Sequence, residues 1–172
     1  MKAILSALCA DNISALQRLR AVIAQLNAAQ YTAAVTPCDS GIGAHVRHIL
    51  DHYDALWVGI ESGHINYDAR ERDRSTEVDR DAANQRIDQQ IQKLHDLAEQ
   101  PLSTDLTVCM DCGSQLSTQI AAPTSLAREL QFLVSHTVHH DALIAAAAKQ
   151  LSIIISADFG VAPSTLRHAT AN

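Results

Sequence analysis

Apolar residues recur at intervals of three and four in four stretches of the chain, which is the spacing that places them on one face of a helix. The pattern predicts helices over about residues 3–30, 39–63, 76–99 and 125–151. Asp39 or Ser40 is a suitable N-cap for the second of these helices. Four amphipathic helices in one chain favour an all-α fold, a four-helix bundle.

The connections between these helices differ in character. Residues 64–75 form a polar link, which is long enough to let the second and third helices run parallel. Residues 102–122 are rich in Ser, Thr, Val and Ile, with Gly113 near their middle, and they predict a short β-hairpin between the third and fourth helices. With no internal linker, residues 1–172 are expected to form a single domain.

Composition and charge narrow the function classes. The 172 residues are 47% hydrophobic and 19% charged, which is typical of a folded chain. A formal net charge of −6 argues against a nucleic-acid partner and against binding to an anionic membrane. No apolar run reaches the roughly 18 residues that span a bilayer. We therefore expect a cytoplasmic protein with a small-molecule partner.

The second predicted helix carries three histidines on one face. With His48 set at zero, His45 lies near +60° and His52 near +40° around the helix axis, at about 100° per residue. The other residues on this face, Gly41, Ala44, Ala55 and Gly59, are small. Small side chains beside imidazoles leave room for an ion or a substrate.

The fourth predicted helix carries His136 and His140 at i and i+4, one above the other on an apolar face. Two imidazoles on such a face are costly unless their nitrogens find partners, and a metal ion supplies one. A third imidazole from a facing helix leaves coordination positions open, as in a catalytic site. The alternative is a bundle without a metal, in which these imidazoles pair with carboxylates or backbone groups.

Other residues admit a functional and an ordinary interpretation. Arg70 and Arg72 lie in the charged link and either bind a substrate carboxylate or form solvated ion pairs. Glu129 either accepts a hydrogen bond from an imidazole or is a helix N-terminal charge. Cys109 and Cys112 form a CxxC pair without the second pair that a zinc ribbon needs, so we interpret them as two thiols in the hairpin.

The histidine-bearing segments, residues 42–48 and 136–140, resemble the DinB/YfiT-like superfamily of metal-dependent four-helix-bundle enzymes. Residues 41–52, 67–73, 128–130 and 159–165 resemble more closely an uncharacterised bacterial branch of it. The resemblance implies an up-down-down-up bundle that is often a homodimer. It also implies a divalent metal (Zn, Ni, Mn or Fe) held by His48, His136 and His140.

The resemblance further implies thiol transferase or hydrolase chemistry. A metal ion can lower the pKa of a bound water towards about 7, or it can bind the thiolate of a low-molecular-weight thiol. His52 or His139 is then the expected general base. The alternative is a non-catalytic metal-binding or stress-response protein, in which His52 or His139 closes the site as a fourth ligand.

Overall fold

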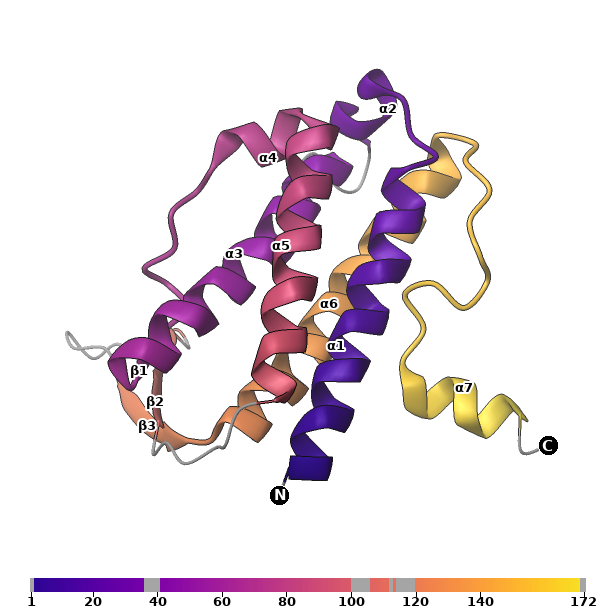
Figure 1. Ribbon diagram of the computed structural model, residues 1–172. Helices are drawn as coiled ribbons and strands as arrows, with labels where there is room; N and C mark the ends of the chain where they lie inside the picture. Colours follow the sequence, from indigo (N-terminus) through magenta and orange to yellow (C-terminus); the bar gives the residue numbers. More distant parts are fainter. Residues whose placement is uncertain (1, 36–40, 100–105, 112, 114–119, 171–172) are drawn as a thin grey trace.

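The computed structural model describes residues 2–35, 41–99, 106–111, 113 and 120–170 (Figure 1). It is mostly helical, as the sequence predicted. The long helices are α1 (Lys2–Ile23), α3 (Ile42–Ser62), α5 (Arg80–Ala98) and α6 (Leu126–Gln150), and the short ones are α2 (Ala28–Thr32), α4 (Arg74–Val78) and α7 (Pro163–Thr170). The strands are β1 (His64–Asn66), β2 (Leu106–Cys109) and β3 (Ala121–Thr124).

The long helices bury a common core. Helix α1 packs against α5 and α6, and α3 packs against the same two helices. Inside this core, the hydroxyl of Tyr53 on α3 donates to Oδ1 of Asn12 on α1 at 2.8 Å. The amide nitrogen of Asn12 donates in turn to the carbonyl oxygen of Leu130 on α6 at 3.1 Å. These buried hydrogen bonds fix α1, α3 and α6 relative to one another, since a register shift would leave polar groups unpaired.

Two predicted helices are each broken in two. The predicted helix over 3–30 ends at Ile23, and α2 begins after Asn27. Asn27 and Gln30 form a capping box, which starts a new helix instead of continuing the old one. The predicted helix over 76–99 is likewise divided at Asp79, whose side chain accepts from the backbone N–H groups of Asp81 and Ala82. The N-cap predicted at Asp39 or Ser40 falls outside the described residues, and α3 follows Gly41.

The predicted hairpin is present, because β2 pairs antiparallel with β3, with Leu106 opposite Thr124. The predicted polar link over 64–75 also contains secondary structure that the sequence did not predict, namely β1 and the start of α4. Strand β1 pairs parallel with β2, with His64 opposite Thr107. Gly59 permits this return of the chain against α3, because a Cβ there would lie 2.2 Å from a side-chain carbon of Ile65. The three-stranded sheet lies at the end of α3 (Figure 1).

The segment after α6 returns along the outside of the helices. Phe159 is buried in the core, and Gly160 lies so close to α6 that a Cβ would be 2.5 Å from the backbone nitrogen of Ala142. Only a residue without a side chain fits there. No helix in the described part of the chain combines the length and apolar character required to cross a membrane.

Candidate metal centre

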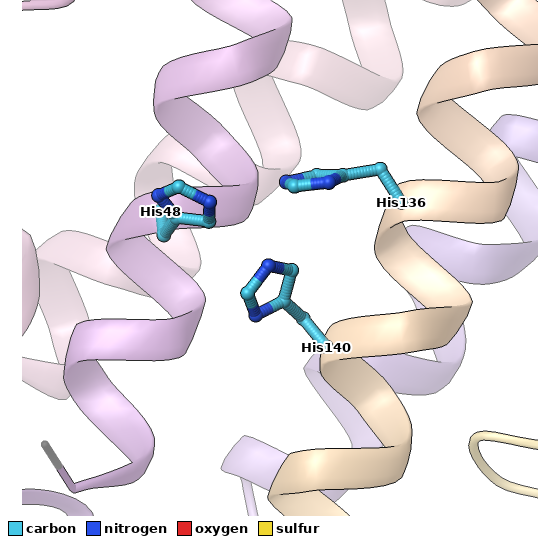
Figure 2. A group of neighbouring side chains, drawn as sticks. All are labelled: His48, His136 and His140. Carbon is cyan, nitrogen blue, oxygen red and sulfur yellow. The ribbon is translucent and has the colours of Figure 1, made fainter. Parts of the chain in front are cut away.

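Three of the predicted histidines converge between α3 and α6. Figure 2 shows His48 pointing from α3 towards His136 and His140 on α6. One ring nitrogen from each residue lies within 4.8 Å of the other two. The ring centroids are 5.0 Å apart for His48 and His136, and 4.6 Å apart for His48 and His140. Three imidazoles at this separation can turn onto one ion.

Local sequence explains why these side chains meet. His136 and His140 are one helical turn apart, so their rings meet edge to face on one side of α6. The opposite side of α3 is held against α4 at Gly43, where a Cβ would lie 2.0 Å from the carbonyl oxygen of Glu77. Close packing on that side fixes the first turns of α3 and so positions His48 opposite α6.

Burial keeps the three imidazoles neutral. It is the main cause that lowers the pKa of His48 to about 3, of His136 to about 2 and of His140 to about 3, and nearby imidazoles lower each pKa further. A neutral imidazole has the lone pair that a metal ion needs. The residues are therefore in the protonation state of ligands at neutral pH.

The hydrogen-bonding state of the ring nitrogens is a second observation that fits a divalent ion. Nε2 of His136 and Nε2 of His45 are buried without a hydrogen-bond partner in the described structure. A buried polar atom without a partner costs about 1–3 kcal/mol. An ion between the rings would supply such a partner to His136. The group contains three imidazoles and no fourth ligand among the described residues, and three is the number of protein ligands that catalytic zinc sites use.

His52, which the sequence offered as a general base, is buried beside this cluster with both ring nitrogens engaged. Its Nδ1–H donates to the carbonyl oxygen of His48 at 2.8 Å. Its Nε2 accepts from Nη1 of Arg70 at 3.0 Å. Burial is the main cause that lowers its pKa, to about 4. The ring also stacks on Tyr67, with 5.3 Å between centroids. These contacts hold His52 as a neutral side chain and bring Arg70 to the cluster.

The remaining candidates lie further out. His139 is exposed on α6, with its ring 5.1 Å from that of His140. Arg72 is exposed and is not brought to the histidines. Glu129 is buried, but it accepts from the hydroxyl of Tyr67 at 2.8 Å and from Thr124, not from an imidazole. Sequence reasoning did not identify Tyr67, and nothing in the spacing of the polar link predicts its contact with His52.

Cys109 of the CxxC pair is a free, buried thiol in β2, and Cys112 lies outside the described residues. Cys9 is also a free thiol in the core, and burial raises its pKa to about 11. A thiol in that environment is unreactive at neutral pH. Neither described cysteine belongs to the histidine cluster.

A groove of about 750 Å³ opens on the other side of Arg70, between α3, α5 and the segment after β1. It is lined by charged and aromatic side chains, among them Asp54, Trp57, Arg70, Arg86 and Lys93. Nε of Arg70 is buried without a partner in the described part of the chain. Arg70 therefore links the groove to His52 and retains a donor that nothing in the described fold uses.

Asp141, the residue after His140, is 1% exposed, and neither carboxyl oxygen has a partner among the described residues. Burial raises its pKa to about 8. The folded chain therefore holds this proton between about pH 4, where the unfolded chain loses it, and about pH 8. Over that range the free energy of unfolding falls with rising pH, by up to about 1.4 kcal/mol per pH unit.

We expect Asp141→Asn to abolish that decline, because an amide does not ionise. In urea unfolding of the metal-free protein, the variant should match the wild type near pH 4 and exceed its stability by a few kcal/mol above about pH 8. Asp11→Asn, at an exposed carboxylate on α1, is the control and should keep the wild-type profile. Parallel pH profiles for wild type and Asp141→Asn would contradict the prediction.

Comparison with known proteins places the chain in a family. The sequence profile of the DinB superfamily matches residues 13–144, a span that includes all of α3, most of α6 and all three converging histidines. The chain belongs to the DinB superfamily. This confirms the resemblance found in the sequence. The DinB match leaves out the first turns of α1, the last turns of α6 and the segment that follows α6.

One curated relative of this DinB protein is "FK506-binding protein 5" from Rhizopus delemar. The two are 35% identical over 104 residues, which are 60% of this chain and 27% of the fungal protein. The chain thus spans about a quarter of that relative's length. No solved structure matches the chain.

Proposed function

We propose that this DinB protein is a metal-dependent enzyme with an open three-histidine centre for a divalent ion. The observation that carries the proposal is the convergence of His48, His136 and His140 within 4.8 Å, in a group that contains no fourth described ligand. The proposal includes the up-down-down-up bundle order and the homodimer that the resemblance implies.

A divalent ion in such a centre supplies Lewis acidity, which favours deprotonation of a water or of a small thiol at neutral pH. The metal (Zn, Ni, Mn or Fe) and the choice between hydrolysis and thiol transfer are finer parts of the proposal. Imidazole ligands are compatible with all four metals.

The side chains around the centre are candidates for proton transfer and for substrate binding. His139 is exposed beside His140, so its imidazole can exchange a proton with substrate and solvent. His52 is the weaker candidate for general base, because its Nε2 lone pair already accepts from Arg70. Arg70, with its buried Nε that has no partner among the described residues, suits an anionic group of a small-molecule substrate. Arg72, which is exposed, is a candidate for the same role further from the centre.

The alternative function, a metal-binding or stress-response protein without chemistry, needs a closed site. One observation favours it: Nδ1 of His45 lies only 3.0 Å from Nδ1 of His140, so a fourth imidazole is close at hand. The number of exchangeable positions on the bound ion distinguishes the two functions.

Cobalt(II) is a suitable probe, because its visible spectrum reports coordination. Purified without a metal-affinity tag, the wild type should bind about one Co²⁺ per chain, and added 2-mercaptoethanol or azide should change the spectrum. If the protein binds Co²⁺ and neither additive changes the spectrum, the site is closed. That result would support the non-catalytic alternative. A folded protein that binds none of Zn²⁺, Ni²⁺, Mn²⁺, Fe²⁺ and Co²⁺ would overturn the metal centre itself.

A further inference from the structure

A fourth histidine is in direct contact with the proposed ligand set. His45 lies on the first turn of α3, three residues before His48, and faces α6. Its Nδ1 is 3.0 Å from Nδ1 of His140, which is a hydrogen-bond distance between two ring nitrogens. The ring centroids are 5.3 Å apart and tilted by 42°. One of the two nitrogens therefore carries a proton and the other accepts it.

We infer that His45 is a positioning residue of the metal centre: it accepts a hydrogen bond from Nδ1–H of His140 and so leaves Nε2 of His140 as the ligand atom. The inference rests on the proposed function, since it assigns a role relative to the ion. It concerns one hydrogen bond and adds no ligand to the three.

The numbers of N–H groups and lone pairs on the two rings support this direction of the hydrogen bond. A neutral imidazole has one N–H and one lone pair, and a metal ion takes the lone pair. Nδ1 of His140 is engaged by His45, which leaves Nε2 as the nitrogen available to an ion, and a ring bound through Nε2 carries its proton on Nδ1. Metal-ligating histidines regularly donate their second ring N–H to an acceptor, which fixes the tautomer and the ring orientation.

His45 can accept because a neutral imidazole has one ring nitrogen with a lone pair. The neutral ring that accepts at Nδ1 carries its proton on Nε2, and this nitrogen is buried without a partner in the described residues. Helix α3 thus provides one ligand, His48, and also supports a ligand of the opposite helix.

The test compares two substitutions of different chemistry. An asparagine side chain at this position would place an amide oxygen close to where Nδ1 of the imidazole lies, so His45→Asn retains the acceptor, whereas His45→Leu removes it. We expect His45→Leu to weaken Zn²⁺ and Co²⁺ binding about 10–100-fold in competition with a chelator, and His45→Asn to weaken it much less. The Co²⁺ spectrum at saturation should be unchanged in both variants. His95→Ala, at an exposed histidine on α5, is the control for loss of an imidazole.

A second readout needs no variant. In the Zn²⁺-loaded wild type, two-bond ¹H–¹⁵N correlations should show His140 protonated on Nδ1 and metal-bound through Nε2. Metal on Nδ1 of His140 would overturn the inference, as would a Co²⁺ spectrum that changes in His45→Leu, which would make His45 a ligand. Equal affinity with and without the acceptor would overturn it while leaving the proposed function intact. A wild type that binds no metal overturns both, and that result is seen before any variant is measured.

Discussion

Replacing His136 by alanine should abolish metal binding while leaving the fold intact. His136 contributes a ring nitrogen, Nε2, that is buried and has no other partner in the described structure. Its loss leaves two imidazoles, His48 and His140, on opposite sides of the space between α3 and α6 (Figure 2). We expect a loss of affinity greater than the roughly 10–100-fold that removal of an outer partner causes. Elemental analysis after dialysis should find the ion in the wild type and none in the variant.

A stability measurement separates this effect from unfolding. A ligand that binds only the folded state stabilises it by about 4.1 kcal/mol at a free concentration of about 1,000 Kd. Zn²⁺ should therefore raise the urea midpoint of the wild type and of the control His95→Ala, but not that of His136→Ala. Circular dichroism should show equal helix content in all three. A variant that keeps one ion per chain at wild-type affinity would contradict the assignment of His136 as a ligand.

The grouping of His48, His136 and His140 is the part of the candidate site that the sequence predicted best, and the reason is local periodicity. His136 and His140 share a face of one helix at any helix position, so their juxtaposition needs no tertiary information. His48 was selected from three histidines on its helix through the family resemblance. Spacing alone did not distinguish it from His45, which the structure places against His140.

His52 was predicted as a general base and Arg70, separately, as a substrate-binding residue. In the structure the two side chains are hydrogen-bonded to each other. No pattern in the sequence joins them, since Arg70 lies in a link without periodicity. Strand β1 was missed for the same reason. Its three residues pair with β2, more than 40 positions away, and short segments take their conformation from such distant partners.

The breaks at Asn27 and Asp79 were visible in the sequence as capping residues but were outweighed by the apolar periodicity on either side. A capping box supplies partners to backbone N–H groups and so ends one helix and begins another within a continuous amphipathic pattern. Boundaries therefore depend on single polar side chains, whereas the existence of a helix depends on many apolar ones.

Replacing Asp51 by alanine should destabilise the protein by about 3–5 kcal/mol, more than any other single change to its described ion pairs. Asp51 lies on α3, and its side chain is fully buried. It accepts from Arg47 on the same helix at 2.9 Å and from Arg86 on α5 at 3.2 Å. Both guanidinium groups are themselves largely buried, with 17% and 16% of their side chains exposed. Removal of the carboxylate leaves two desolvated cations short of a partner.

An exposed ion pair provides the contrast that makes this prediction specific to burial. Lys2 and Glu99 are 3.1 Å apart with most of both side chains in solvent, so Glu99→Ala should cost at most about 1 kcal/mol. Urea unfolding of Asp51→Ala, Asp51→Asn and Glu99→Ala measures all three, and Asp51→Asn keeps the test possible if the alanine variant does not fold. Similar stability losses for Asp51→Asn and Glu99→Ala would contradict the prediction. In that case Arg47 and Arg86 would be held well enough by their other partners, Glu77 and Asp54, to do without the buried carboxylate.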